Sequence, residues 1–279
     1  MLNRPVNKQF SVLIITVNYG NPSPVKDLIK SIHPDADVKL WIEDNSSSDL
    51  SLIPLEKMKE KAGFHIDIFP HTQNHFYWGG ANQALIRLGK KQELWPRWII
   101  ICNNDVCFDN QFFSYLKTID ARKHKIIAPK VFSNFKKINL NPFFENRLSK
   151  MEKMYYKFVN FHWLTARFIQ FLGRYLNYHL NQKPNTNSLT RPIYAPHGSC
   201  IIFSSEFFKM GGYLDDGFQM FGEELSTAEI AKELNVQIMY HPKLVIKHND
   251  HFSTGNLSWR KLYDISQATH RYLNKTYNL

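Results

Sequence analysis

The stretch WIIICNNDV (98–106) joins an apolar run to a polar turn that carries one carboxylate. An unbroken apolar run of this length suits a strand buried on both faces of a parallel sheet. Ligands of such sheets bind beyond the carboxyl ends of the strands. We therefore expect Asn104 and Asp105 to lie at a ligand-binding edge, where Asp105 can supply a hard oxygen ligand to a metal ion. The alternative is a turn acid that caps the next element.

Apolar runs on either side of this stretch predict further strands of the same sheet. Helix-start signals separate them: Ser23 precedes Pro24 and is expected to cap one helix, and the pair Gly79–Gly80 is expected to begin another. Strands that alternate with helices predict an α/β fold with a mostly parallel sheet and helices on both faces. The expected strands are SVLIITVN (11–18), VKLWIEDN (38–45), FHIDIFP (64–70), KIIAPKV (125–131), YAPHGSCIIFS (194–204) and VQIMYHP (236–242).

The 279 residues are expected to form a single domain in three parts. Residues 1–133 form an α/β half, residues 134–190 a basic, aromatic helical insert, and residues 191–279 a second half that ends in a helix from Trp259. Steps of three or four residues between large apolar side chains of the insert predict one helical stripe, which either lies on a membrane or packs as core. The stripe consists of Phe158, Phe161, Leu164, Phe168, Phe171, Tyr175 and Tyr178.

The net charge of +11 is concentrated in the same part of the chain. Residues 122–183 hold 13 Lys and Arg against 2 Asp and Glu, which leaves 22 basic and 22 acidic residues elsewhere. A surplus confined to one segment predicts a patch that faces an anionic partner. Nucleic acid, anionic lipid and a phosphorylated substrate all satisfy this expectation.

Cysteine usage and the lengths of the apolar runs bear on location. Three cysteines without a CxxC pair favour a reducing compartment over a disulfide framework or a zinc site. The first ten residues lack the apolar core of a signal peptide, and no run approaches the ~20 apolar residues of a membrane-spanning helix. We therefore expect a cytoplasmic protein, either free or bound peripherally to the inner face of the cell membrane.

Two further polar motifs lie at a strand end and at a helix start. In IEDNSSSD (42–49), Asp44 can accept a hydrogen bond from a ligand, although Asn, Ser and Asp also gather in ordinary turns. In GGAN (79–82), the glycines leave backbone N–H groups accessible to a ligand, although helix capping is the commoner explanation.

FGEEL (221–225) places Glu223 and Glu224 side by side after the turn GGYLDDGFQM (211–220). A general base must reach an acceptor hydroxyl and stay ionised at neutral pH, and either Glu suits that role. The alternative is that both acids favour the first turn of a helix through its dipole. His248 follows the last expected strand and His197 lies in PHGSC (196–200). Isolated histidines of this kind are more often structural than ligands.

Taken in order, these motifs resemble those of the family-2 inverting glycosyltransferases, especially the bacterial rhamnosyltransferase-like branch that builds surface polysaccharides. The resemblance implies the GT-A fold, in which residues 1–133 bind the nucleotide-sugar and residues 191–279 bind the acceptor and carry the catalytic base. The matching segments, within residues 11–255, are SVLIITVN, IEDNSSSD, GGANQAL, IIICNNDV, APKV, GGYLDDGFQMFGEEL and HPKLVIKH.

By position, the resemblance assigns Glu224 as the catalytic base and Glu223 as its neighbour. It places Asp44 at the nucleotide base, and Asp105 and His248 at a Mg²⁺ or Mn²⁺ ion beside the diphosphate. Further nucleotide-sugar contacts are implied for Asn18, Asn45, Gly79, Gly80, Asn82 and Asn104.

Three departures from the family pattern bear on this chemistry. Asn103 and Asn104 stand where relatives often carry a further acid, which predicts modest metal affinity. Glu224 replaces an Asp and is one methylene longer. LSTAEIA (225–231) lacks the acid and the arginine that usually follow the Glu-Asp pair.

The resemblance therefore implies an inverting hexosyl- or deoxyhexosyltransferase. Its donor would be a nucleotide-diphospho-sugar, and its acceptor a glycan, expected to be lipid-linked and held at an anionic membrane surface. Three alternatives are a catalytically weak nucleotide-sugar-binding relative, a nucleotidyltransferase, and a basic nucleic-acid-binding protein. The absence of a Gly-rich Lys/Arg loop after the first strand weighs against the nucleotidyltransferase. The sequence has no RRM, KH or helix-turn-helix signature, so nucleic acid is not expected as a partner.

Overall fold

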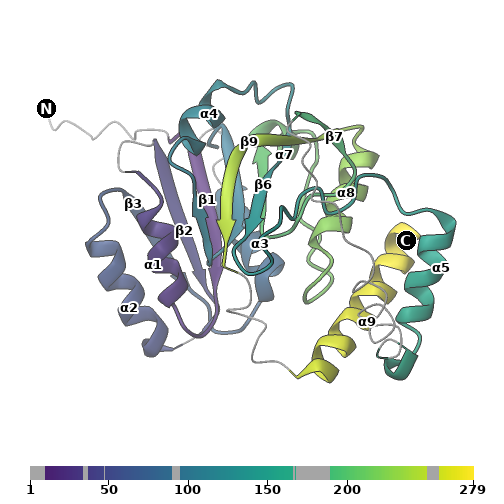
Figure 1. The fold of residues 1–279 in the computed structure, drawn as a ribbon. Coiled ribbons are helices and arrows are strands. Elements are labelled where there is room, and N and C mark those ends of the chain that lie inside the picture. Colours follow the sequence, from purple (N-terminus) through teal and green to yellow (C-terminus); the bar gives the residue numbers. More distant parts are fainter. Residues whose placement is uncertain are drawn as a thin grey trace, which may run out of the picture.

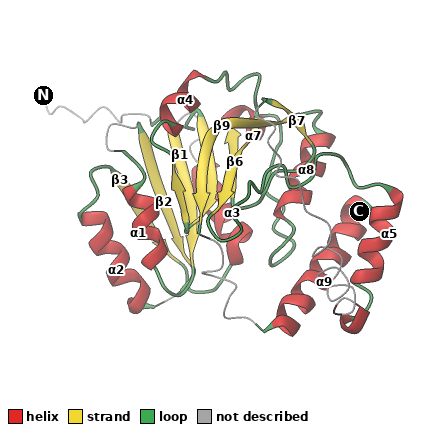
Figure 2. Cartoon of the chain, viewed as in Figure 1, coloured by secondary structure: helices red, strands yellow, loops and turns green. Residues whose placement is uncertain are grey.

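The computed structural model describes residues 10–33, 37–46, 48–89, 95–165, 167, 189–249 and 258–279. These residues form a nine-stranded sheet with helices packed around it (Figures 1 and 2). The strands are β1 (Val12–Asn18), β2 (Val38–Asp44), β3 (His65–Pro70), β4 (Trp98–Asn103), β5 (Val106–Phe108), β6 (Ile126–Ser133), β7 (Arg191–Ile193), β8 (Cys200–Ser204) and β9 (Ile238–His248). The helices are α1 (Ser23–Lys30), α2 (Asp49–Glu60), α3 (Phe76–Gly89), α4 (Phe112–Thr118), α5 (Lys150–Val159), α7 (Ser205–Lys209), α8 (Glu223–Glu233) and α9 (Trp259–Tyr277).

The strand order is β3-β2-β1-β4-β8-β6-β9-β5, and β7 also pairs with β9. Parallel pairing joins β1 to β2 and β4, β2 to β3, and β6 to β9. Strand β8 is antiparallel to both β4 and β6, so β1, β2, β3, β4, β6 and β9 all run in one direction. The mostly parallel α/β sheet predicted from the sequence is confirmed.

Two hydrophobic cores lie on opposite faces of the sheet because successive strand residues point to opposite sides. On one face, Val12 and Ile14 of β1 pack with residues of α1, α2 and α4. On the other, Leu13 and Ile15 pack with residues of α3, α7, α8 and the end of α9. All seven residues of β1 are buried, as expected for a strand covered by helices on both faces.

Helices α5 and α9 lie side by side at the edge of the molecule away from α1 and α2 (Figure 1). Lys153 Nζ donates to the carbonyl of Asn278 at 2.5 Å, and Gln267 Nε2 donates to the carbonyl of Asn160 at 2.7 Å. The ring centroids of Trp163 and Trp259 are 6.5 Å apart. Among the described helices, none combines the length and apolarity needed to cross a bilayer.

The starts of two helices differ from the sequence prediction. Helix α3 begins at Phe76, so Gly79 and Gly80 lie inside it rather than at its start. Gly80 fits close packing instead, because a Cβ on it would meet Val17 Cγ2 at 2.9 Å. In α1 the side chain of Ser23 makes no cap, and Asn21 Oδ1 accepts the Ser23 N–H at 3.0 Å.

The prediction of one continuous helical stripe in the basic insert is also wrong. Helix α5 ends at Val159, where Asn160 closes it through a backbone hydrogen bond to Tyr156. His162 Nδ1 then accepts the Leu164 N–H at 3.2 Å, which separates Leu164 from α5. The described members of the stripe (Phe158, Phe161 and Leu164) are exposed, so for them the core interpretation is wrong. The other four members lie outside the described residues.

Candidate active site

Three strand ends carry the polar residues of the candidate site to one edge of the sheet. In the parallel register, Asn18 at the end of β1 pairs with Asp44 at the end of β2. Val17 pairs with Asn103, so β4 ends at the same level and delivers Asn104 and Asp105 there. The ligand-binding edge predicted from the sequence is thus built from residues that are far apart in the chain.

A chain of hydrogen bonds links these strand ends. Asn104 Nδ2 donates to Asn18 Oδ1 at 3.0 Å, and Asn18 Nδ2 donates to Asp44 Oδ1 at 3.0 Å. The Ser51 and Ser46 hydroxyls donate to the same Asp44 oxygen at 2.9 and 2.8 Å. This bonding fixes the Asp44 carboxylate and occupies one of its two oxygens.

Two neighbouring acceptors at this edge are buried without a hydrogen-bond partner among the described residues. They are Asp44 Oδ2 and Asn45 Oδ1. Buried polar atoms are normally paired, so an orphaned acceptor in a native structure calls for an explanation such as an absent ligand. A ligand with N–H or O–H donors, such as a nucleoside, would satisfy both atoms.

Asp105 and His248 meet because strand β5 turns back onto the end of β9. Val106 pairs with His248 in the antiparallel register, and the Asn249 N–H donates to the Asp105 carbonyl at 3.0 Å. His248 Nε2 lies 3.1 Å from Asp105 Oδ1 and 3.3 Å from Asn103 Nδ2. Both side chains are buried.

This pair fits a metal ion that is held jointly by protein and ligand. A carboxylate and an imidazole are both suitable donors for Mn²⁺, and Mg²⁺ is usually held by one or two carboxylates together with substrate phosphates. Within the described residues, no group of three His, Cys, Asp or Glu side chains could hold a metal without outside ligands. The donor set therefore suits an ion whose coordination is completed by phosphate oxygens and water.

Glu223 and Glu224 form the first turn of α8, after Gly222 at the N-cap. Glu224 Oε1 accepts the backbone N–H of Gly198 at 3.0 Å, and the Tyr77 hydroxyl donates to the Gly198 carbonyl at 3.0 Å. A Cβ on Gly198 would meet Glu224 Oε1 at 2.8 Å, so residue 198 must be glycine for this contact.

Burial affects the pKa of both glutamates. It raises the pKa of Glu224, and burial together with the adjacent Glu224 charge raises the pKa of Glu223 to about 8. The Gly198 N–H favours the ionised form of Glu224. A pKa of about 8 keeps Glu223 mostly protonated at neutral pH.

The segment around Gly198 connects the two acidic positions. The His197 ring lies 6.1 Å from the His248 ring, centroid to centroid, and His197 Nδ1 is 2.9 Å from the Ser199 hydroxyl. The next residue, Gly198, contacts Glu224. A series of contacts through His248, His197 and Gly198 thus runs from Asp105 to Glu224.

The loop that leads into Glu223 is anchored from two sides by residues that sequence reasoning did not assign to the site. Asp215 Oδ1 accepts the Tyr272 hydroxyl of α9 at 2.7 Å, and Asp215 Oδ2 accepts the Tyr277 hydroxyl at 2.5 Å. Asp216 Oδ2 accepts Asn82 Nδ2 of α3 at 2.9 Å. The sequence signal for this anchoring is the doubled acid of LDDGF (214–218), a pattern that an ordinary turn also explains.

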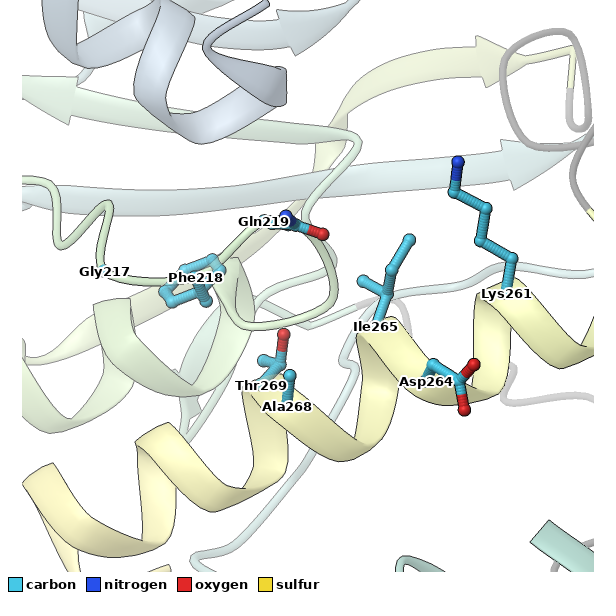
Figure 3. A pocket seen from close by; sticks show the side chains of 8 residues that line it. All are labelled: Gly217, Phe218, Gln219, Lys261, Asp264, Ile265, Ala268 and Thr269. Atoms are coloured by element: carbon cyan, nitrogen blue, oxygen red, sulfur yellow. The ribbon is translucent and has the colours of Figure 1, made fainter.

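A hollow of about 380 Å³ lies between this loop and α9 (Figure 3). Gln219 faces Ile265 and Thr269 across it, and Lys261 and Asp264 stand toward one end. Its walls therefore combine apolar surface with charged and amide groups. The lining residues are Gly217, Phe218, Gln219, Lys261, Asp264, Ile265, Ala268 and Thr269.

The fold of this chain matches solved glycosyltransferase structures. GalNAc-T7, crystallised with UDP, GalNAc and Mn²⁺, gives a TM-score of 0.54 at 13% identity, over 88% of this chain and 45% of that one. Residues 1–349 of S. aureus TarS give a TM-score of 0.53 at 11% identity, over 96% of this chain and 72% of that one. This chain has the GT-A fold.

In sequence, this GT-A chain is 25% identical over 227 residues to the low-salt glycan biosynthesis hexosyltransferase Agl10 of Haloferax volcanii. The match covers 81% of this chain and 62% of Agl10, so the chain spans less than two thirds of that relative's length. No protein-family model matches the chain.

The GT-A sheet brings most of the sequence-predicted site residues to one edge. Asn18, Asp44 and Asn104 share one hydrogen-bond chain, and Asn45 Nδ2 donates to the Phe76 carbonyl at 2.9 Å. Gly80 packs between Val17 and Asn45. Gly79 and Asn82 instead face Asp216 of the anchored loop. The ligand roles assigned to these residues stay predictions.

Proposed function

We propose that this chain is an inverting glycosyltransferase that moves a hexosyl or deoxyhexosyl group from a nucleotide-diphosphate donor to a hydroxyl of a glycan acceptor. One observation carries the proposal. On a GT-A fold, the Asp105–His248 pair lies beside the ring of His197, and Glu224 accepts the backbone N–H of the next residue, Gly198. The Asp105–His248 pair would lie beside the diphosphate of the donor, and Glu224 would act as the base for the incoming alcohol.

The donor nucleoside would lie over the ends of β1 and β2. The orphaned acceptors Asp44 Oδ2 and Asn45 Oδ1 would receive hydrogen bonds from its base or ribose. The first Asp44 oxygen is already held by Asn18, Ser46 and Ser51, so the carboxylate is fixed before the ligand arrives. Fixing a polar group in advance lowers the entropy cost of binding.

Asp105 and His248 would hold a Mg²⁺ or Mn²⁺ ion beside the diphosphate. Such an ion, when bound, stabilises the negative charge of the leaving diphosphate. Since no third protein ligand joins this pair among the residues that the structure describes, metal affinity should be modest without the nucleotide and higher with it. The Mn²⁺ and UDP in the GalNAc-T7 structure support this expectation by analogy of fold alone.

Glu224 would take the proton of the acceptor hydroxyl as it attacks the anomeric carbon from the face opposite the diphosphate. The new C–O bond forms as the bond to the diphosphate breaks, so the configuration inverts in one displacement. Glu223, with its pKa raised to about 8, would stay mostly protonated beside this base at neutral pH. General base catalysis of this kind contributes about 10²–10⁴-fold.

The acceptor would occupy the hollow beside α9, where Phe218 and Ile265 offer apolar surface and Lys261 and Asp264 offer polar contacts. We propose a lipid-linked glycan as the acceptor and the cytoplasmic face of the cell membrane as the location. The cysteines support a reducing compartment: Cys102 and Cys200 lie opposite each other in the register of β4 and β8, and both are free.

Isothermal titration of the chain with UDP, GDP and dTDP, with and without Mn²⁺, tests donor and metal binding together. We expect one nucleoside diphosphate to bind in the presence of Mn²⁺, and Asp105→Asn to weaken the Mn²⁺-dependent part about tenfold or more. Asp109→Asn, an exposed acid after β5, is the control and should leave binding unchanged. Absence of binding by all three nucleotides would contradict the proposal.

A second candidate is a nucleotide-sugar-binding protein with little turnover. The acid-poor turn Asn103–Asn104–Asp105 favours it, because a single carboxylate holds a metal weakly. Nucleotide binding without transfer to any glycan acceptor would select this candidate.

A further inference from the structure

The outward face of α5 carries apolar side chains where a surface helix normally carries polar ones. Met151, Met154, Tyr155 and Phe158 are between 51% and 77% exposed. Their spacing of i, i+3, i+4 and i+7 places them on one face of the helix, and no residue of α5 is buried. Phe161 and Leu164, also exposed, follow directly. We call these six residues the α5 outer face.

A stripe of lysines borders the α5 outer face. Lys150, Lys153 and Lys157 recur at i, i+3 and i+7, on the side of the helix next to the apolar residues. Lys150 and Lys157 are exposed, and Lys153 donates to the Asn278 carbonyl. These lysines belong to the segment of residues 122–183 that holds the whole net positive charge of the chain.

We propose that the α5 outer face docks this protein on an anionic lipid bilayer. An amphipathic helix lies in the plane of a membrane with its apolar side chains among the acyl chains and its basic side chains at the lipid phosphates. The long lysine stems allow the ammonium groups to reach that level. A second copy of the chain is the poorer occupant, because it would bring two lysine stripes together.

Docking through α5 would also bring a membrane-bound acceptor to the enzyme. This part of the inference rests on the proposed function. Helix α5 contacts α9 through Lys153–Asn278 and Gln267–Asn160, and α9 forms one wall of the hollow assigned to the acceptor. A bilayer at the α5 outer face would therefore be separated from the hollow by the pair of helices α5 and α9. A glycan attached to a membrane lipid could then reach Glu224 while its lipid stays in the bilayer.

Sedimentation with vesicles tests the docking without any enzyme assay. At low salt we expect the chain to bind vesicles of phosphatidylcholine mixed with phosphatidylglycerol, and to bind pure phosphatidylcholine far less. M151Q/M154Q should weaken binding about tenfold or more, because two exposed apolar contacts are lost. L50Q/I53Q is the matched control: it changes exposed apolar residues with the same spacing on α2 and should bind like the wild type.

A second pair of variants tests the charge. K150Q/K157Q should weaken binding to anionic vesicles and reduce its salt dependence, whereas K57Q/K61Q, at the end of the far helix α2 and at its C-cap, should not. Absent vesicle binding at low salt, or wild-type binding by M151Q/M154Q, would overturn the proposal. So would a wild-type dimer that M151Q/M154Q dissociates, since a second copy would then cover the face. Nucleotide titration of the same preparations reports separately on the proposed function.

Discussion

Glu223 and Glu224 stand next to each other at the start of α8, and their chemistry depends on one being neutral. The folded chain keeps a proton on Glu223 up to about pH 8, whereas the unfolded chain releases it near the ordinary value of 4.5. Between these values the folded state binds more protons, so the free energy of unfolding should fall as pH rises. One proton gives a slope of up to ~1.4 kcal/mol per pH unit.

Glu223→Gln removes this titration, so its free energy of unfolding should vary less over the same pH window. Urea unfolding from about pH 5 to about pH 8 measures the slope. Glu233→Gln, an exposed acid at the far end of α8, is the control and should keep the wild-type slope. Equal slopes for Glu223→Gln and the wild type would mean that Glu223 is not held neutral by the fold.

Gly198 is the residue on which the position of the proposed base depends. A Cβ at this position would lie 2.8 Å from Glu224 Oε1 and 3.3 Å from Glu224 Cδ, so Gly198→Ala should push the carboxylate aside. Displacement of a reacting group by about 1 Å can lower turnover about 10²-fold. We expect kcat to fall by that order while nucleotide affinity is kept.

Gly89→Ala is the matched control, because a Cβ on Gly89 meets nothing within 4 Å. Its turnover should equal that of the wild type. Steady-state kinetics of both variants, together with nucleotide titration, decides the point. Wild-type turnover by Gly198→Ala would show that the contact with Glu224 has no part in catalysis.

At the scale of elements, α9 both anchors the loop before Glu223 and lines the hollow. Lys261 stands toward one end of this hollow (Figure 3). In the proposed function the hollow holds the acceptor, so Lys261 would contact the acceptor and not the donor. Lys261→Ala should raise the acceptor KM about tenfold, as expected for loss of one charge-assisted hydrogen bond, and leave the donor KM unchanged. Initial rates with either substrate varied provide the measurement.

Lys275→Ala, which changes an exposed lysine near the end of the same helix, controls for a general effect on α9. It should leave both KM values unchanged. An equal change in donor KM and acceptor KM for Lys261→Ala would remove the hollow from the acceptor site.

The elements predicted from the sequence were those with strong local signals. Strands β1 and β4 occur where continuous apolar runs placed them, and the last helix begins at Trp259 as expected. Strand β5 could not be predicted, because its three residues are held by pairing with β9, which lies about 140 residues further along the chain. Helix α5 was predicted as part of a longer stripe, because periodicity does not register the local breaks at Asn160 and His162.

The candidate site was predictable in its parts but not in its connections. Carboxylates and amides after strands indicated one edge, since parallel strands end together. The link from His248 through His197 to Gly198 and Glu224 depends on antiparallel pairing and on one loop, neither of which leaves a local pattern. The anchors of the loop at Tyr272 and Tyr277 were missed for the same reason.

At the scale of the whole molecule, one sheet joins the part that would bind the donor to the part that carries Glu224. Strand β8 of the later segment lies between β4 and β6 of the earlier one, so the two parts share a core. The boundaries at residues 133 and 190 stay a prediction. The α5 outer face belongs to the segment between them. The donor would thus meet the edge of the shared sheet, and the acceptor and the membrane would meet helices α9 and α5 beside it.

Turnover by Glu224→Gln with a panel of nucleotide-sugars and lipid-linked glycans is the most direct test of the central claim. The substitution keeps the size of the side chain and removes the base. For the wild type we predict release of a nucleoside diphosphate and a glycoside whose anomeric configuration, read by NMR, is inverted. For Glu224→Gln we predict a loss of about 10²–10⁴-fold in kcat with nucleotide affinity kept. Near-normal turnover by Glu224→Gln, or a product of retained configuration, would contradict the account.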